Sequence, residues 1–521
     1  MAIMARTNGQ VDGTAAPATP RSRFVPSEQQ ERFLDAIRTG DSHLLLEARA
    51  GSGKSTTCRE GARLLPLGTR AWYACFNAHI AREFQEDLPA SCRARTLHSF
   101  GLELIRKKLG DIQIDDDKVD RLAEPYFPDR FQRGERSSVA RLVSILKNQL
   151  IPADLISDQV LDELAATFGV DIPDDARGEV YGVAAEVFQV SFDRLSTIDF
   201  DDMVWLPVVM GFSPVNPPDV LFVDEAQDLN ACQHHLVDQL CPTGRMVVVG
   251  DRYQSIYRFR GADSYSIERF ERRLARSDRG IDTYPLTVTR RCPIRHVEMA
   301  RRLVRDLDHL PGAMPGEVSE CKPADVAGHL QPGDMVLCRT NAPLVSQCYS
   351  LIRQGRKAIV RGRDIGRGLL ALMAKLRPSS VADLTRAVAD HRSREMNRLA
   401  ALLNPENAQQ TVGDKCDCLL ALTEGAATVN EVRERIETLF SDATEEGAIV
   451  LSSIHKAKGL ERDHILVLRP DLLPGPWAKD REDMQQERNV AYVCATRARR
   501  RLTFAGPIPA ILGGSEMVSD S

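Results

Sequence analysis

Residues 47–57 read EARAGSGKSTT, a glycine-rich stretch between a short apolar run and a sequence of helical character. The apolar run His43–Glu47 is expected to be a strand, and Thr56–Leu65 a helix. A strand, a glycine-rich turn and a helix N-terminus direct several backbone N–H groups at one point, where the helix dipole also favours an anion. Lys54 then supplies a mobile charge for β- and γ-phosphates, and the Ser55 hydroxyl can bind Mg²⁺. The stretch therefore predicts a site for a nucleoside triphosphate.

The predicted phosphate-binding loop departs from the strict pattern at its first position, where glycine is usual and this chain has alanine. Its strand–turn–helix context favours a nucleotide site over the alternative, a glycine turn with an incidental lysine. The residues expected to surround the phosphates are Ala48, Arg49, Ala50, Gly51, Ser52, Gly53, Lys54, Ser55 and Thr56.

Composition limits the class of protein. The 521 residues, 43% of them hydrophobic, are enough for about three or four domains with full cores. No apolar run approaches the roughly 18 residues that cross a membrane, so no membrane partner is expected. Scattered cysteines without a CxxC pair, and no histidines at zinc-ligand spacing from them, predict a reducing cytosol and no structural metal. The net charge of −5 does not exclude a nucleic-acid partner, because local basic surfaces decide binding in a large protein.

Apolar and helical stretches alternate in two blocks, which predicts an α/β fold with two parallel-sheet units. Residues 1–23 are rich in Ala, Thr and Pro and are expected to form a disordered tail. The first unit is expected at 24–280, with a helical insertion at about 101–195, and the second at 281–521, with a helical insertion at about 366–445. The further expected strands are Ala71–Phe76, Val220–Val223, Met246–Val249, Met335–Cys338, Ala358–Val360, Ile449–Leu451 and His464–Leu468, and a further helix is expected at Ala78–Leu88.

Residues 221–229, LFVDEAQDL, end an apolar strand in two adjacent carboxylates. Asp224 can hold Mg²⁺ directly or through water, and Glu225 can orient and deprotonate the attacking water. Alone, such a pair is usually a solvated turn. Because it follows a phosphate-binding loop with one insertion between them, we interpret it as part of a hydrolytic site.

Residues 247–262, VVVGDRYQSIYRFRGA, combine a polar strand end with a segment of alternating aromatic and basic residues. Gln254 can donate a hydrogen bond to a γ-phosphate or to the attacking water. Beyond it, Tyr257, Arg258, Phe259 and Arg260 could stack bases and meet phosphates, at about 1–3 kcal/mol per stacked base. From these residues alone, an ordinary amphipathic segment with a core phenylalanine stays open.

Taken together, these motifs resemble those of superfamily 1 DNA helicases of the UvrD/PcrA/Rep type, in family order over about residues 24–504. The resemblance implies two RecA-like motor domains, ATP and Mg²⁺ as cofactors, and single-stranded DNA and its junctions with duplex DNA as partners. It implies an ATP-dependent helicase or translocase that moves 3′ to 5′, since SSIHKAKGLE at 452–461 has the form typical of that polarity. It implies no particular protein partner, and it implies a location in the cytoplasm of a bacterial or phage-infected cell, near the nucleoid.

By the same resemblance, residues of both units should contact ATP. Gln30 should recognise adenine, and Arg290 stands where the family usually has a tyrosine that stacks on the base. Arg291, in LTVTRRCP at 286–293, should reach the γ-phosphate, and Arg497, in ERNVAYVCATRA at 487–498, should be an arginine finger. The arginine-finger role of Arg497 has independent physical support, because hydrolysis between two domains needs a cation from the opposite wall, worth about 10³–10⁵ in rate.

The resemblance also implies a track for single-stranded DNA across both units. Phe259 stands where the family usually has tryptophan, and FNAHIAREF at 76–84 is similar to the F-box DNA helicase and phage-encoded branch. Histidines in such motifs are as often packing residues as DNA contacts. The residues expected to contact DNA are Phe76, Asn77, Thr96, His98, Tyr257, Phe259, Arg260, His455 and Lys458, with Glu461 beside them.

Three other functions stay open from the sequence. The second insertion is short for the family, so the chain could be a translocase that remodels protein–DNA complexes with little unwinding. It could also be a helicase-like subunit of a repair or defence complex, although the intact set of candidate catalytic residues argues against a non-catalytic role. A motor on RNA is the third alternative, since no residue pattern addresses the 2′-hydroxyl. Repair, recombination, replication, phage and defence pathways all stay open, as does the oligomeric state.

Overall fold

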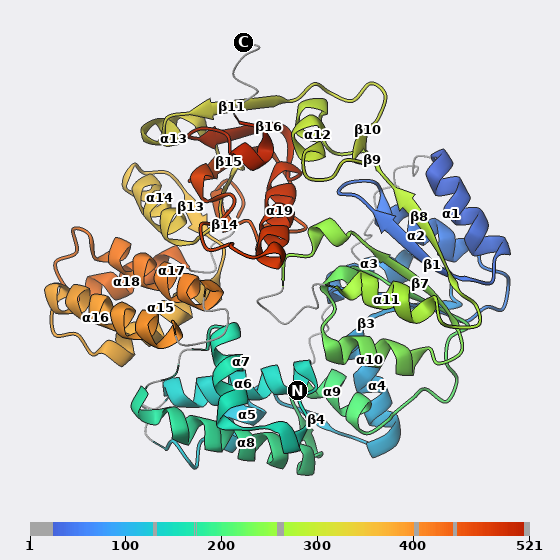
Figure 1. Cartoon of the computed structure of the whole chain (residues 1–521), viewed down its shortest axis with the longest axis horizontal. Helices are drawn as coiled ribbons and strands as arrows, with labels where there is room; N and C mark the ends of the chain where they lie inside the picture. Colours follow the sequence, from blue (N-terminus) through green and yellow to red (C-terminus); the bar gives the residue numbers. More distant parts are fainter. Residues whose placement is uncertain are drawn as a thin grey trace, which may run out of the picture.

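A computed structural model of the chain describes residues 24–128, 133–170, 172, 174–257, 265–400, 406–440 and 445–514. The expected tail at 1–23 and two expected DNA contacts, Phe259 and Arg260, lie outside the described residues. Figure 1 shows two units, each built around a sheet, with a cluster of helices beside each of them.

The first unit is built on a six-stranded sheet in the order β3-β2-β6-β7-β1-β8, in which every neighbouring pair is parallel. Its helices pack on both faces, as Figure 1 shows. The strands are β1 (His43–Ala48), β2 (Ala71–Cys75), β3 (Cys92–Thr96), β6 (Val220–Val223), β7 (Arg245–Gly250) and β8 (Ile281–Leu286), and the helices are α1 (Glu28–Thr39), α2 (Lys54–Arg63), α3 (Ala78–Asp87), α10 (Ala231–Leu240) and α11 (Ser266–Leu274).

The candidate catalytic residues of the first unit lie at one edge of this sheet. Strands β6, β7 and β1 are neighbours and are buried along their whole length. They end at Asp224, at Asp251 and at the phosphate-binding loop respectively. Because the carboxyl ends of parallel strands meet at the same edge, three segments far apart in sequence are brought to one place.

The second unit repeats this plan with a parallel sheet in the order β11-β16-β15-β12-β14-β13. The strands are β11 (Glu317–Cys321), β12 (Met335–Cys338), β13 (Ala358–Val360), β14 (Ile449–Ser453), β15 (Arg462–Leu468) and β16 (Ala498–Ala505), and the helices are α12 (Ile294–Arg301), α13 (Val326–His329), α14 (Ala342–Arg353) and α19 (Arg481–Ala495). A small parallel ribbon, β9 (Val288–Thr289) with β10 (Asp308–His309), lies between the two sheets in sequence.

Each unit carries a helical insertion. The first comprises α4 (Leu97–Leu109), α5 (Lys118–Ala123), α6 (Arg133–Gln149), α7 (Asp158–Thr167), α8 (Arg177–Asp193) and α9 (Asp202–Val209), with the ribbon β4 (Gln113–Ile114) and β5 (Thr197–Ile198). The second comprises α15 (Arg363–Leu376), α16 (Val381–Leu399), α17 (Glu406–Thr423) and α18 (Val429–Leu439). Short 3-10 turns are η2 (Ala153–Leu155), η3 (Asp174–Ala176), η4 (Ala226–Asp228), η5 (Arg252–Gln254), η7 (Pro323–Asp325), η8 (Pro470–Leu472) and η9 (Ala510–Leu512).

The two insertions contact each other as well as their own units. Ala166 of α7 packs with Leu399 of α16, and Val412 of α17 lies against them. Arg398 Nη1 lies 3.6 Å from Asp162 Oδ1 across the same contact. In Figure 1 these helices meet on the side of the molecule away from the contact between the two sheets. The two halves of the chain therefore touch at two separate places.

The α/β class and the eight predicted strands are confirmed, with end points that differ by at most two residues. The helix predicted at Thr56–Leu65 begins earlier, at Lys54, because Gly53 already adopts the cap position. The expected boundary at 280 falls before β8, which pairs with β1 and so belongs to the first sheet. We therefore propose the division into two motor domains with the boundary after Leu286. Among the described residues, no helix has the length and apolar character needed to cross a membrane.

His234 makes the first unit sensitive to acid. Its ring is buried, with Nε2 2.7 Å from the Ser266 hydroxyl and its centroid 4.6 Å from that of Phe270. Burial, with a smaller effect of nearby Arg273, lowers its pKa to about 3. The unfolded chain binds this proton near pH 6.5 and the folded chain does not. Stability is therefore complete above pH 6.5 and is lost as the pH falls toward 3.

We expect the contribution of His234 to the unfolding free energy to fall by about 2 kcal/mol between pH 6.5 and 5, since one pH unit is worth about 1.4 kcal/mol. Urea unfolding at the two pH values measures this loss. The variant His234→Gln should lose correspondingly less, whereas His235→Gln, at the exposed neighbouring position, should behave like the wild type. An equal loss in all three proteins would contradict the assignment.

Candidate active site

The phosphate-binding loop connects β1 to α2 and requires glycine at two positions. Gly51 and Gly53 have φ of 72° and 88°, in the left-handed region that other residues rarely adopt. A Cβ at Gly51 would also lie 2.6 Å from the Arg291 Cβ and 2.7 Å from the Thr289 Oγ1. Gly53 caps α2 without any side-chain hydrogen bond to the helix. The first N–H groups of α2 are thus left for an anion.

Lys54 lies between the two carboxylates predicted to act with it. Its Nζ is 2.5 Å from Glu225 Oε1 and 3.8 Å from Asp224 Oδ1. Burial raises the pKa of Asp224 to about 6 against the opposing charge of Lys54. At Glu225 burial is outweighed by Lys54 and Lys458, and its pKa falls to about 2. The two neighbouring carboxylates therefore differ, and Glu225 is the one held firmly ionised.

Glu225 is held in an unusual backbone conformation. Its φ of 49° is left-handed, which costs free energy in a residue other than glycine. Its carboxylate accepts a hydrogen bond from Gln227 Nε2 at 2.5 Å in addition to the contact with Lys54. This geometry aims the side chain back over the phosphate-binding loop, where a general base for water would need to lie.

Gln254 lies on η5, directly after β7. Its Nε2 donates to Asp251 Oδ2 at 2.7 Å, and Asp251 is fully buried at the sheet edge. Burial raises the pKa of Asp251, and Arg49 opposes the rise. The structure thus brings Gln254 to the same edge as Asp224 and Glu225.

Both arginines expected at the site belong to the second unit, and Arg291 lies against the loop from the opposite side. Arg291 pairs with Glu461, and its Nη1 is buried without a hydrogen-bond partner. The guanidinium of Arg497 is buried, and it donates from Nε to the Val493 carbonyl and from Nη2 to the Thr496 hydroxyl, both at 3.1 Å. Among the described residues no carboxylate lies within ion-pair distance of Arg497. Burial, followed by the charge of Arg291, lowers its pKa to about 10.

Arg291 is paired with Glu461, whereas among the described residues Arg497 has no ion-pair partner and lies within reach of the charge of Arg291. Buried cations are normally paired, because an isolated buried charge is costly. Here burial and the positive charge of Arg291 lower the pKa of Arg497, and the Nη1 atom of Arg291 has no hydrogen-bond partner. A γ-phosphate bound at the loop would accept from the unused donor of Arg291, and the donors of the loop, Lys54 and Arg291 fit a nucleoside triphosphate.

The expected adenine-binding residues also lie together. Gln30 is buried, and its Nε2 donates to Thr57 Oγ1 at 2.7 Å. Its Oε1 accepts from the Ser27 N–H and from Arg290 Nη2, both at 2.9 Å. Ser27 and Gln30 form the capping box of α1, so one glutamine caps a helix and faces the nucleotide site.

Several expected DNA contacts line the first unit near the ends of β2 and β3. Phe76 is 51% exposed, and Asn77 and Thr96 cap helices α3 and α4. The His98 ring stacks on Phe200, with centroids 4.1 Å apart and planes at 25°. Burial lowers the pKa of His98 to about 4, so its ring is neutral at physiological pH.

Phe200 is a candidate base-stacking residue that was not predicted from the sequence. It is 53% exposed although it stacks on His98, so one face of the aromatic pair is open to solvent. The available signal was IDFDD at 198–202, an aromatic residue among carboxylates where the insertion returns to the sheet.

The structure places Lys458 elsewhere than on an exposed DNA track. Its Nζ is buried in the contact between the two units, 2.5 Å from Asp228 Oδ2 and 2.6 Å from the Gln254 carbonyl oxygen. It also lies 5.0 Å from the centroid of the Tyr257 ring, and the Tyr257 hydroxyl donates to the His455 carbonyl at 3.0 Å. Lys458 is therefore a link between units. No local pattern in the sequence pairs Lys458 with a carboxylate 230 residues away, so this link was not predicted.

Replacing Lys458 with alanine should destabilise the folded chain by about 3–5 kcal/mol, because Asp228 would stay buried without its cation. Burial already raises the pKa of Asp228 to about 6, against the lowering effect of Lys458. Urea unfolding measures the loss. The double variant Asp228→Ala/Lys458→Ala should lose less than Lys458→Ala alone. A single variant as stable as the wild type would show that the pair contributes nothing.

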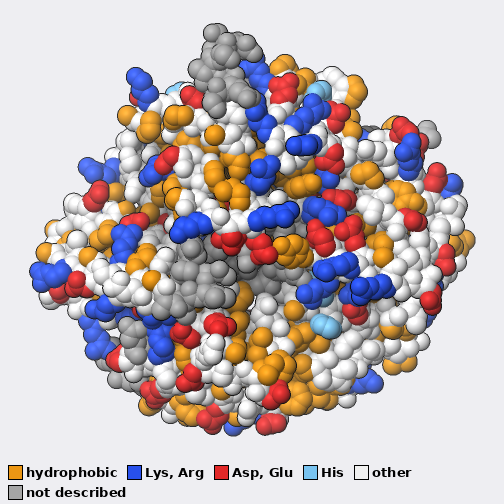
Figure 2. Space-filling model, in the orientation of Figure 1, with side chains coloured by type: hydrophobic (Ala, Val, Ile, Leu, Met, Phe, Trp, Pro, Cys, Tyr) orange, Lys and Arg blue, Asp and Glu red, His pale blue; other side chains and the backbone are white. Residues whose placement is uncertain are grey.

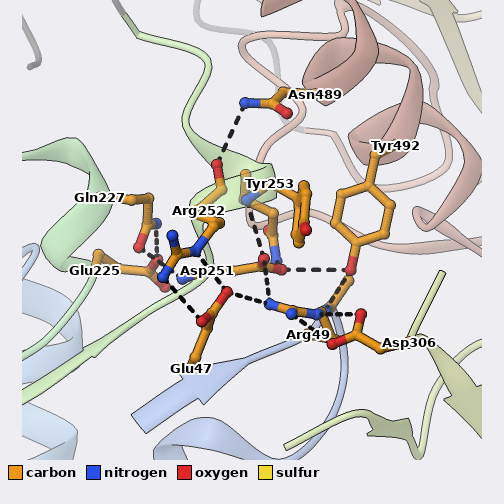
Figure 3. A network of polar contacts seen from close by, with 12 residues as sticks. Glu47, Arg49, Glu225, Gln227, Asp251, Arg252, Tyr253, Asp306, Asn489 and Tyr492 are labelled. Carbon is orange, nitrogen blue, oxygen red and sulfur yellow. Dashed lines mark hydrogen bonds and ion pairs between the residues drawn. The ribbon is translucent and has the colours of Figure 1, made fainter. Parts of the chain in front are cut away.

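Helix α19 reaches from the second unit to the loop itself. The Tyr492 hydroxyl accepts from the Ala50 N–H at 2.9 Å and donates to Asp251 Oδ2 at 3.3 Å. Asn489 Nδ2 donates to the Ser255 and Arg252 carbonyls. Figure 3 shows both side chains pointing from α19 toward the first unit. The helix that precedes Arg497 thus contacts two segments of the nucleotide site directly.

Two family models match the chain. Residues 28–275 match the UvrD/REP helicase N-terminal domain, and residues 374–506 match the UvrD-like helicase C-terminal domain. The chain belongs to the UvrD/REP helicase family. The first match includes the phosphate-binding loop, Asp224 and Gln254, and the second includes His455 and Arg497. Arg290 and Arg291 lie between the two matched segments.

This UvrD-like chain is similar to several bacterial DNA helicases. The ATP-dependent DNA helicase PcrA of Leuconostoc citreum is 28% identical over 267 residues, and PcrA of Bacillus subtilis (strain 168) is 28% identical over 274 residues; each alignment covers 46% of this chain and 34% of the relative. The ATP-dependent DNA helicase UvrD1 of Mycobacterium leprae is 27% identical over 300 residues, 47% of this chain and 37% of that protein. The matches thus span about a third of the relatives' length. An arterivirus nonstructural protein 10 (helicase) structure matches with a TM-score of 0.34 and 10% identity, over 93% of this chain and 63% of that one.

Proposed function

We propose that this chain is an ATP-dependent motor on single-stranded DNA, which moves 3′ to 5′ and unwinds duplex DNA ahead of it. The observation that carries the proposal is that Arg291 of one unit lies against the phosphate-binding loop of the other, with its buried Nη1 unused, while Arg497 of the same unit is buried without an ion-pair partner among the described residues. A site divided between two sheet units in this way makes hydrolysis depend on their approach. The relatives' names, which describe ATP-dependent DNA helicases, support the same activity.

The residues of the site suggest how each would act. Lys54 exchanges its contact with Glu225 for the β- and γ-phosphates, which releases the Glu225 carboxylate to orient and deprotonate the attacking water. Ser55 and Asp224 would hold Mg²⁺, which neutralises charge on the phosphates. Gln254 would contact the γ-phosphate or the water, and Arg291 and Arg497 would stabilise the charge of the transition state. Gln30 and Arg290 would bind the base.

The DNA track we propose crosses the face on which Phe76, Asn77, Thr96, and the stacked pair His98 and Phe200 lie. Tyr257 and His455 would extend it toward the second unit, and we propose Phe259 and Arg260 beside them from sequence alone. On the face in Figure 2, basic side chains gather across the middle of the molecule, with acidic ones among them. This local charge supports binding of a polyanion despite the net charge of −5. A location on nucleoid DNA in the cytoplasm stays a prediction.

Unwinding of two matched substrates tests the proposal. A duplex with a 3′ single-stranded tail and one with a 5′ tail are incubated with the protein, Mg²⁺ and ATP, and the released strand is measured. We expect release from the 3′-tailed duplex only. Release from the 5′-tailed duplex alone would contradict the polarity. Movement along single strands without release from either duplex, measured by displacement of streptavidin from a biotinylated end, would favour a translocase that remodels protein–DNA complexes.

A further inference from the structure

Arg49, the second residue of the phosphate-binding loop, points into the contact between the two units. Its side chain is 6% exposed. Nε donates to Asp306 Oδ1 at 2.9 Å and Nη2 to Asp306 Oδ2 at 2.6 Å, a two-pronged contact with the segment between α12 and β10 of the second unit. Figure 3 shows Arg49 and Asp306 facing each other beside Tyr492. A residue of the nucleotide loop is thus bound to the opposite unit by its side chain.

Within its own unit, Arg49 already has two carboxylate neighbours. Nη1 donates to Glu47 Oε1 at 2.8 Å and lies 3.7 Å from Asp251 Oδ1. The guanidinium also lies over the Tyr253 ring, 4.7 Å from its centroid. Glu47 is held in addition by Arg252, at 2.7 and 3.0 Å. Removal of Asp306 would therefore leave Arg49 paired, so the link between units can be broken without leaving an unpaired buried charge.

The second unit grips the loop at two consecutive residues. The side chain of Arg49 binds Asp306, and the backbone N–H of Ala50 donates to the Tyr492 hydroxyl. Immediately beyond lie Gly51 and Ser52, where the loop turns around the phosphate position. A shift of the second unit away from the first would pull on residues 49 and 50, and through them on the shape of the loop.

We propose that Arg49 and Asp306 form a clasp that couples closure of the two units to the shape of the phosphate-binding loop, with Arg49 as a positioning residue. This rests on the proposed ATPase function. The clasp favours the closed arrangement, in which the loop and the two arginines of the second unit approach each other. Because ATP binds that arrangement, loss of the clasp lowers the fraction of chains ready to bind ATP and raises the apparent dissociation constant by the same factor.

The expected size of the change in ATP affinity follows from the solvent exposure of Asp306. Asp306 is 45% exposed, so its pair with Arg49 is partly screened by water. A contribution of about 0.5–1 kcal/mol corresponds to about a two- to fivefold change in an equilibrium constant. The hydrolysis rate at saturating ATP does not depend on the clasp, because bound ATP then stabilises the closed arrangement.

The test compares Asp306→Ala with Asp308→Ala. Asp308 is a matched control: it is exposed and pairs with Arg301, a residue of its own unit. We expect Asp306→Ala to raise the KM for ATP about two- to fivefold at saturating single-stranded DNA, with kcat close to wild type. Asp306→Glu, which can still reach Arg49 with two oxygens, should recover part of the loss. Asp308→Ala should leave both constants unchanged.

A second readout does not depend on activity. Hydrogen exchange of the backbone amides in the peptide that covers residues 48–53 should be faster in Asp306→Ala than in the wild type or in Asp308→Ala. If the wild type hydrolyses ATP but Asp306→Ala matches it in KM and in loop exchange, the clasp is refuted and the proposed function stands. If the wild type hydrolyses no ATP, the proposed function fails, and the exchange measurement still decides whether the clasp holds the loop.

Discussion

Lys54→Ala should abolish DNA-stimulated ATP hydrolysis while binding of single-stranded DNA stays close to wild type. Lys54 is the cation at the N-terminus of α2, and its contacts with Glu225 and Asp224 show that it can reach the place where triphosphate oxygens would lie. The proposed DNA contacts Phe76, His98 and Phe200 lie on other segments. Steady-state hydrolysis and fluorescence anisotropy of a labelled oligonucleotide measure the two properties separately.

The control for this variant is Lys107→Ala. Lys107 is an exposed lysine of α4 that pairs with Glu103, outside the nucleotide site. It should hydrolyse ATP like the wild type, and circular dichroism should show both variants folded. Full hydrolysis by Lys54→Ala would refute the site assignment. Loss of both activities with a native fold would mean that Lys54 also serves the DNA track.

Arg497→Ala should keep ATP affinity within several-fold of wild type and lose turnover by about 10³ or more. The buried guanidinium of Arg497 contacts a carbonyl and a hydroxyl rather than a carboxylate, so its removal leaves no buried carboxylate unpaired. The charge that it would stabilise develops in the transition state, and the loss should therefore appear in kcat rather than in binding. Single-turnover hydrolysis measures the rate of the chemical step. Titration with a fluorescent ATP analogue measures the affinity, so the two effects are separated.

Two further variants sharpen this result. Arg497→Lys keeps the charge but loses the planar fork of donors, and it should recover little of the rate. Arg500→Ala, an exposed arginine three residues along on β16, should turn over ATP like the wild type. An unchanged kcat in a folded Arg497→Ala protein would refute the arginine-finger role.

The sequence predicts the strands that contain a continuous apolar run and misses those that do not. Central strands such as β1, β6 and β7 are buried along both faces, and each reads as a continuous apolar run. Strands β3, β8 and β11 lie at the edges of their sheets and carry exposed polar residues. In β3, for example, Arg93 and Arg95 face outward and pair with Glu103. No apolar run marks such a strand, so only pairing in the folded chain reveals it.

The candidate site also contains residues whose positions follow from the sequence and residues whose positions only the folded chain reveals. Four candidate residues follow strands of the first sheet: Lys54, Asp224, Glu225 and Gln254. The end of a strand fixes where the next side chains lie, and the structure brings these four together at one edge of the sheet. Lys458 follows a strand of the other unit, and its position depends on how the two units pack. Its buried pair with Asp228 joins segments that no local pattern relates. The same holds for Arg49 and Asp306, and for Phe200, which faces His98 only after the insertion has folded.

The central claim is that hydrolysis at the divided site is coupled to single-stranded DNA. The most direct measurement is the steady-state rate of Mg²⁺-dependent ATP hydrolysis by the wild-type chain, alone, with single-stranded DNA and with single-stranded RNA of the same sequence. We expect slow hydrolysis alone, strong stimulation by DNA and little by RNA, with the stimulation absent in Arg497→Ala. A rate that is the same with and without DNA would contradict the account.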